Sequence, residues 1–189
     1  MSDLIKPWIL LEEDDISPSV WYPLRKQKVQ LPNGLVVDDY FLSPLGDVVQ
    51  VLAITPDNQI VLTRQYKHGL GEILLELPGG MQQKGKTLLQ SAVAELEEEC
   101  GIKTAEEDLK FICKFAINPT KLKQVTYGYI LFNAEFNSIQ KPDITENIEV
   151  LKVPATEVLR MVDDGKIWVT DSMNLILMAA RQYPDIFGG

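Results

Sequence analysis

The sequence predicts an α/β fold in which a mixed β-sheet lies between layers of helices. Strand-like segments dominate the chain, and one helical segment stands between strands while two follow the last strand. Because this order lacks the regular strand–helix alternation of a doubly wound parallel sheet, a mixed sheet fits it better. The chain has 189 residues with an apolar content of 46%, enough for one domain with a substantial core and a small additional element.

Residues 1–44 are predicted to form that additional element, a small N-terminal β unit. Its first part contains the acidic run Glu12–Asp15, which is interpreted as a solvated face or a loop. Farther on, the turn signal Pro32-Asn33-Gly34 stands between two apolar segments and predicts a hairpin. The main domain is expected to span residues 45–189.

Apolar runs separated by turn residues predict the elements of the main domain. Strands are expected at residues 48–54, 60–64, 73–77, 109–115, 125–134 and 148–153. Helices are expected at residues 87–101, 156–165 and 172–181. Thr156 is the expected N-cap of the second helix, because its hydroxyl can accept a hydrogen bond from the first turn.

The stretch from Leu77 to Ile102 carries most of the candidate chemistry. Pro78-Gly79-Gly80 cannot continue regular structure and predicts a glycine loop after the preceding strand. Thr87 and Gln90 have the spacing of a capping box, so a helix should begin at Thr87. Gly101 is expected to end that helix.

Three carboxylates gather on one arc of this helix. Glu95, Glu98 and Glu99 are related as i, i+3 and i+4, whereas Glu97 points away from them. Because like charges at this spacing repel, such an arc favours a bound cation, and oxygen ligands suit Mg²⁺ or Mn²⁺. Carbonyl groups of the glycine loop could add ligands. The alternative interpretation of the arc is a solvated acidic helix face.

The same stretch resembles the Nudix box of the Nudix hydrolases, G-x5-E-x7-R-E-U-x-E-E-x-G-U, where U is aliphatic. Seven residues match it in register: Gly80, Glu95, Leu96, Glu98, Glu99, Gly101 and Ile102. Two positions depart, because Lys86 replaces the first Glu and Ala94 replaces the Arg. In the family this Arg orients and neutralises the metal-binding glutamates, so Glu98 loses its i,i+4 partner. Lys86 could partly compensate for that loss or could occupy the metal region.

The resemblance extends over roughly residues 28–181. Within the family, the chain is similar to the ADP-ribose pyrophosphatase and nucleoside-diphosphate-sugar hydrolase subgroup. The segments that carry it are Leu31–Gly34 with Tyr40-Phe41, Arg64–Lys67, Glu76–Gly80, and Gly165-x-Ile167 with Asp171-Ser172. It implies a Nudix-type α/β/α sandwich. It also implies a homodimer in which the N-terminal β element packs on the partner or is exchanged with it.

Carried over by position, the resemblance implies a Mg²⁺ or Mn²⁺ site. The Gly79 carbonyl and the side chains of Glu95 and Glu99 would be ligands, and Glu98 would also lie near the metal. In relatives, a Glu in the loop before the long strand assists catalysis. The corresponding loop Asn118–Gln124 has no carboxylate, so Glu95 or Glu98 would have to act as the base.

Further residues match positions that contact the substrate. Lys67 matches a basic position that contacts a substrate phosphate, Met81 lies beside the diphosphate, and Arg64 could hold another phosphate oxygen. The implied reaction is metal-dependent hydrolysis of the diphosphate linkage of a nucleoside diphosphate-X compound, such as ADP-ribose or a nucleotide sugar. The departures at Lys86 and Ala94 motivate an alternative, a catalytically impaired Nudix-fold nucleotide-binding or regulatory module. An unrelated structural protein with an acidic helix is a third hypothesis.

Charge and composition restrict the partners. The net charge of −9 argues against a general nucleic-acid or anionic-membrane binder, although a local basic pocket for phosphate remains compatible with it. The sequence shows no signal peptide and no apolar run long enough to span a bilayer, so the cytoplasm is the expected location. Cys100 and Cys113 are interpreted as reduced, mostly buried thiols.

Overall fold

A computed structural model of the protein describes residues 5–188 and separates the chain into two compact units. The first unit comprises Met1–Gly46 with Ala116–Gln124, and the second comprises Asp47–Phe115 with Val125–Gly189. The proposed boundary after residue 44, and the dimerisation role of the N-terminal element, stay predictions.

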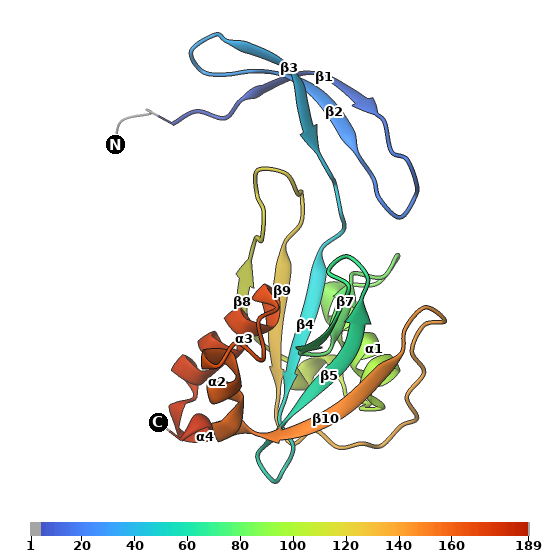
Figure 1. Ribbon diagram of the computed structural model, residues 1–189, viewed down its shortest axis with the longest axis vertical. Coiled ribbons are helices and arrows are strands. Elements are labelled where there is room, and N and C mark those ends of the chain that lie inside the picture. Colours follow the sequence, from blue (N-terminus) through green and yellow to red (C-terminus); the bar gives the residue numbers. More distant parts are fainter. Residues whose placement is uncertain (1–4, 189) are drawn as a thin grey trace. The chain divides into compact units, whose positions relative to one another are not determined.

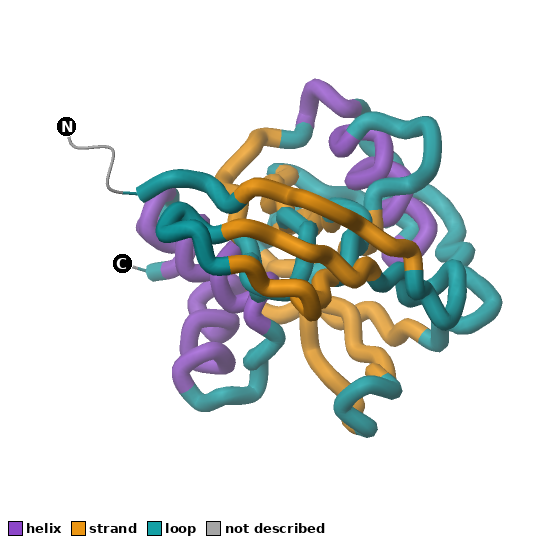
Figure 2. Tube along the Cα trace, turned by 90° about the horizontal axis from the view of Figure 1, so that it is seen from above, coloured by secondary structure: helices purple, strands orange, loops and turns teal. Residues whose placement is uncertain are grey.

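The first unit is built on a three-stranded antiparallel sheet with the order β1-β2-β3 (Figures 1 and 2). Its strands are β1 (Ile9–Asp15), β2 (Arg25–Gln30) and β3 (Val36–Leu42). The predicted hairpin at residues 32–34 is confirmed. All of β1 is solvent-exposed, as expected of a solvated face, but it is a strand and not a loop. Cross-strand ion pairs such as Glu12–Lys28, at 3.1 Å, offset the low strand propensity of its acidic residues.

The second unit contains two sheets (Figure 1). A mixed sheet has the order β7-β4-β9-β8, with β4 and β9 parallel, and an antiparallel sheet has the order β10-β5-β6. The strands are β4 (Val48–Ala53), β5 (Gln59–Lys67), β6 (Glu72–Glu76), β7 (Gly79–Met81), β8 (Lys110–Phe115), β9 (Thr126–Leu131) and β10 (Ile148–Pro154). The helices are α1 (Leu88–Cys100), the 3₁₀ turn η1 (Glu106–Asp108), α2 (Ala155–Asp163), α3 (Thr170–Gln182) and α4 (Pro184–Phe187).

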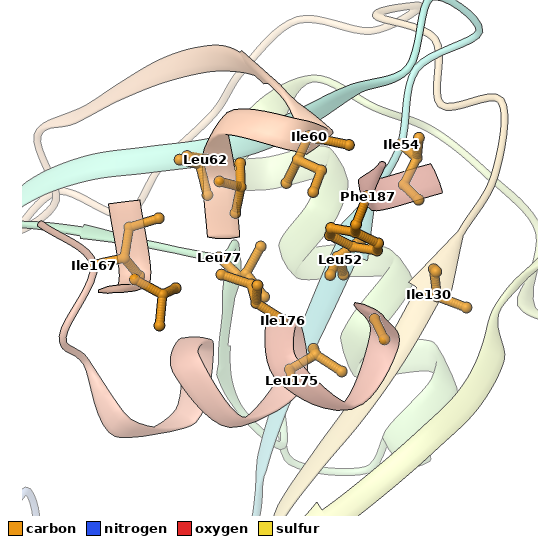
Figure 3. Packing of buried hydrophobic residues seen from close by; sticks show 14 of the residues in the cluster. Leu52, Ile54, Ile60, Leu62, Leu77, Ile130, Ile167, Leu175, Ile176 and Phe187 are labelled. Atoms are coloured by element: carbon orange, nitrogen blue, oxygen red, sulfur yellow. The ribbon is translucent and has the colours of Figure 1, made fainter. Parts of the chain in front are cut away.

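Alternation along β4 divides the core of this unit into two layers. Val49 and Val51 pack with Leu96 and other residues of α1 on one face of the sheet. On the other face, Leu52 packs with Ile176 in a cluster that helices α2, α3 and α4 complete (Figure 3). Helices therefore cover both faces, and the predicted α/β/α fold with a mixed sheet is confirmed.

The helix ends agree with the sequence predictions at α1 but not at α2. Helix α1 begins with a capping box at Thr87 and ends at Gly101 in the left-handed conformation, as expected. The predicted N-cap at Thr156 is wrong, because α2 already begins at Ala155 and Pro154 precedes it without any side-chain cap. The predicted glycine loop is wrong for Gly79 and Gly80, because after a bend at Pro78 both glycines pair with β4 in strand β7. Helix α4 was not expected. Among the described residues, no helix is both long and apolar enough to cross a membrane.

Candidate active site

Two glycines bring the backbone of β7 close to β4 and α1. Gly79 pairs with Gln50 and has φ +155°, and a Cβ at this position would lie 2.1 Å from the Val49 carbonyl oxygen. A Cβ on Gly80 would lie 2.7 Å from the carboxyl carbon of Glu95. Backbone atoms therefore exclude a side chain at Gly79, whereas a side chain at Gly80 would displace the carboxylate of Glu95. The two glycines of β7 and the acidic arc of α1 thus form one site.

Glu99 is the most buried member of the acidic arc. Its side chain accepts a hydrogen bond of 2.8 Å from the Gly79 amide, and the residue is only 2% exposed. Burial raises the pKa of Glu99 to about 8, against the lowering effect of that hydrogen bond. Burial likewise raises the pKa of Glu95 to about 7, with a smaller contribution from the neighbouring charge of Glu98. In both cases burial is the main cause, and the charged neighbours that add to it are other carboxylates.

Glu95 and Glu98 share one hydrogen-bond donor, the Gln83 side chain. Its Nε2 lies 3.2 Å from Glu95 Oε1 and 3.1 Å from Glu98 Oε2. On the other side of the same amide, Lys86 Nζ donates to Gln83 Oε1. Lys86 therefore contacts the acidic arc through Gln83. Sequence reasoning missed Gln83, and the only signal for it was a polar residue in the loop that connects the glycines to α1.

Glu97 lies outside this arrangement, as its place on the helix predicted. Its Oε1 accepts a hydrogen bond of 2.8 Å from Ser138 Oγ. The three remaining glutamates supply the carboxylate oxygens that Mg²⁺ and Mn²⁺ prefer, so the donor set fits such an ion chemically. Within residues 5–188, no three acidic, His or Cys side chains already converge as a metal-binding cluster, and Glu99 is turned towards the Gly79 amide.

The predicted phosphate contacts lie on β5 and divide between its two sides. Lys67 Nζ lies 2.7 Å from Glu76 Oε1, and Gln65 Nε2 donates to the same oxygen at 2.7 Å. Arg64 forms an ion pair with Glu149 of β10. Because successive residues of a strand point to opposite faces, Arg64 and Lys67 are not brought together. The role of each in substrate binding stays a prediction.

Met81 and the loop Asn118–Gln124 complete the predicted set. Met81 is the last residue of β7, where it pairs with Val48, and it is 52% exposed, so its side chain is accessible. The loop belongs to the first unit, in which Gln124 Nε2 donates to the Gly46 carbonyl at 2.8 Å. Its lack of a carboxylate leaves Glu95 and Glu98 as the candidate bases.

A buried polar network on the opposite face of β4 was also missed from sequence. Gln50 Nε2 donates to Ser172 Oγ at 3.0 Å, and Ser172 Oγ accepts from the Leu77 amide at 2.9 Å. Nearby, Thr126 donates to Asp171 Oδ2 at 2.9 Å, and burial raises the pKa of Asp171. These bonds fix the start of α3 against β4, β9 and the segment at Leu77 that leads into β7. A single polar residue inside the apolar run of β4 was the signal.

Comparisons with known proteins show what the sequence and the fold of this chain are similar to. A family model described as NUDIX domain matches residues 44–171. The chain is 28% identical over 160 residues to the methanol dehydrogenase activator of Bacillus methanolicus, covering 84% of each chain. It is 30% identical over 149 residues to the ADP-ribose pyrophosphatase of Bacillus subtilis, covering 77% of each. A solved structure described as an ADP compounds hydrolase matches the fold with a TM-score of 0.84 and 18% identity, covering 97% of this chain and 98% of that one.

Proposed function

Because the chain belongs to the NUDIX domain family, we propose that it is a metal-dependent hydrolase of the diphosphate linkage in a nucleoside diphosphate-X compound, with ADP-ribose or a nucleotide sugar as substrate. The observation that carries this proposal is the junction of the glycine strand with the glutamate arc of α1. The relative from Bacillus subtilis bears the name ADP-ribose pyrophosphatase, which supports the choice of substrate class.

Each of the site residues has a role in this reaction. Glu95, Glu98, Glu99 and the Gly79 carbonyl would hold Mg²⁺ or Mn²⁺. Such an ion, when bound, neutralises diphosphate charge and lowers the pKa of a coordinated water. Glu95 or Glu98 accepts the proton of the attacking water, because the loop Asn118–Gln124 offers no carboxylate.

Lys67 and Met81 would contact the substrate. The buried carboxylate of Glu76 fixes the Lys67 ammonium group by a 2.7 Å ion pair, which presents a positive charge at a defined place. An ammonium has three donors, so Lys67 can contact Glu76 and still donate to a phosphate oxygen. The exposed Met81 side chain would lie beside the diphosphate.

A substrate panel tests the proposed reaction. The purified chain is incubated with ADP-ribose, nucleotide sugars and dinucleotides in the presence of Mg²⁺, Mn²⁺ or a chelator. We expect release of a nucleoside monophosphate with either metal and none with the chelator. Absence of turnover for the whole panel by a folded protein would contradict the proposal.

A second candidate function is a nucleotide-binding or regulatory module with an impaired site. The residues Lys86 and Ala94 favour it, and the relative from Bacillus methanolicus is named as an activator of another enzyme. This candidate predicts nucleotide binding without hydrolysis in the same panel. Equilibrium dialysis with labelled ADP-ribose, run beside the activity assay, separates the two candidates.

We further propose that the chain forms a homodimer through the N-terminal sheet. Strand β1 is exposed along its whole length although it carries Ile9, Leu10 and Leu11, which are 59%, 53% and 44% exposed. A three-stranded sheet with so many exposed apolar side chains gains stability when a partner covers it. Sedimentation equilibrium should give a mass of two chains, and Leu10→Lys should shift the protein towards monomer. A wild-type chain that stays monomeric at every concentration overturns this proposal.

A further inference from the structure

We propose that Gln83 and Lys86 form a positioning pair that orients the carboxylates of Glu95 and Glu98 for cation binding. The inference rests on the proposed function, because it concerns the same metal site. It assigns roles to two residues outside the acidic arc, one of which departs from the expected box.

The contacts of Gln83 connect the two carboxylates. Both hydrogens of its amide nitrogen are used, one towards Glu95 at 3.2 Å and one towards Glu98 at 3.1 Å. Glu95 and Glu98 stand at i and i+3 of α1, where two like charges repel. A donor placed between them holds each carboxylate in one rotamer. Because each carboxylate has about four lone-pair sites, the oxygen sites that Gln83 leaves free can still bind a cation.

Lys86 determines which way the Gln83 amide faces. An ammonium group only donates and a carboxylate only accepts, so Gln83 satisfies all three partners in one orientation alone, with Oε1 towards Lys86 and Nε2 towards the glutamates. The positive charge of Lys86 also polarises the amide, which strengthens the two bonds on its other side. Lys86 thereby acts on the acidic arc without entering it.

The loop backbone places this pair before any ligand arrives. The backbone N–H of Gln83 donates to Ser91 Oγ at 3.1 Å, and Ser91 is fully buried in α1. A turn bond of 3.1 Å from the Lys86 amide to the Gln83 carbonyl sets the distance between the two residues. Gly85 supports the turn with φ +81°. The loop is therefore attached to the helix that carries Glu95 and Glu98.

A surface cavity lies beside Lys86 and Glu98. A cavity of about 300 Å³ is lined by Lys86, Ala94, Glu97, Glu98, Ile139 and Lys141. Ala94 stands one helical turn before Glu98, at i and i+4, so a long basic side chain at position 94 could reach this carboxylate through the cavity. The methyl group of alanine cannot do so. Within residues 5–188, Gln83 is the side chain that donates a hydrogen bond to the Glu98 carboxylate, and the cavity provides room for a rescue experiment.

The test measures the affinity of the metal-free chain for Mn²⁺ by isothermal titration calorimetry. Gln83→Leu keeps the size of the side chain and removes both donors, so we expect about ten-fold weaker binding or more, as is typical when a partner of a metal ligand is lost. Lys86→Met should weaken binding to a smaller extent. Thermal unfolding of each variant checks that it is folded, and exposed Lys86 provides the variant least disturbing to the fold.

A matched control separates positioning from simple charge. Lys84 is an exposed lysine of the same loop and takes no part in the network around Gln83. Removing any lysine near a cation site reduces repulsion, so a pure charge effect strengthens Mn²⁺ binding. Lys84→Met should therefore leave affinity unchanged or raise it slightly. Positioning predicts the opposite sign for Lys86→Met.

Rescue provides the second criterion. Adding Ala94→Arg to Gln83→Leu places a donor beside Glu98 and should restore most of the lost Mn²⁺ affinity, whereas a merely structural role of Gln83 would leave it low. If the parent and Gln83→Leu bind Mn²⁺ with equal affinity, the positioning role is overturned while the proposed function stands. A gain in Mn²⁺ affinity on Lys86→Met has the same consequence. A parent chain that binds no Mn²⁺ overturns both the proposed function and this inference.

Discussion

Replacing Glu99 by glutamine should lower the kcat of diphosphate hydrolysis by about a thousandfold. The variant loses a charged ligand of the proposed metal ion, and such an ion contributes several kcal/mol to transition-state stabilisation. The same change should not destabilise the metal-free protein. Glu99 is 2% exposed, and burial opposes its ionisation. A glutamine oxygen can still accept the hydrogen bond from the Gly79 amide, and its neutral amide avoids the free-energy cost of a buried charge.

Measuring steady-state hydrolysis together with thermal unfolding in a chelator tests both halves of this prediction. Glu97→Gln is the matched control, because Glu97 lies on the same helix but bonds Ser138 away from the arc. It should keep nearly full activity. Activity of Glu99→Gln within a few-fold of the parent would show that Glu99 does not hold the metal.

Replacing Gly79 by alanine should have the largest effect on stability. Its φ of +155° is a conformation that L side chains rarely adopt, and the new Cβ would lie 2.1 Å from the Val49 carbonyl oxygen. Because backbone surrounds this position, the β4–β7 pairing must open to make room. We expect a loss of about 3 kcal/mol or more in the free energy of unfolding, equivalent to a fall in Tm of roughly 6 °C or more.

Gly85→Ala is the control for backbone strain without a clash. Gly85 also has a positive φ, +81°, but a Cβ added there would meet nothing within 4 Å. It should lose only about 1 kcal/mol, the ordinary strain of a left-handed residue. Calorimetric unfolding of both variants measures the difference, and equal losses would show that close packing against β4 does not explain the need for glycine at position 79.

Local sequence rules predicted the framework of the candidate site well. Thr87, Gln90 and Gly101 set the bounds of α1 because capping depends on hydrogen bonds between residues a few positions apart. The arc of Glu95, Glu98 and Glu99 follows from helical periodicity alone. The same rules failed at Thr156, because α2 already begins at Ala155 and no side chain caps it.

Contacts between distant segments decided what the sequence rules left open. The single donor between Glu95 and Glu98 comes from Gln83, twelve and fifteen residues away. Arg64 and Lys67 were both predicted to contact phosphate, but they pair with Glu149 and Glu76 on opposite sides of β5. Acidic residues of β1 lie opposite basic residues of β2, as in the Glu12–Lys28 ion pair. No local pattern contains these partners.

The sequence by itself thus determined the fold class, the helix that carries the glutamates and the glycines before it, because periodicity, capping and turn formation act over a few residues. Only the tertiary structure decided how the charges of the site are balanced. A side chain such as Lys86 acquires its role from the groups that folding brings near it, and in this protein that group is Gln83.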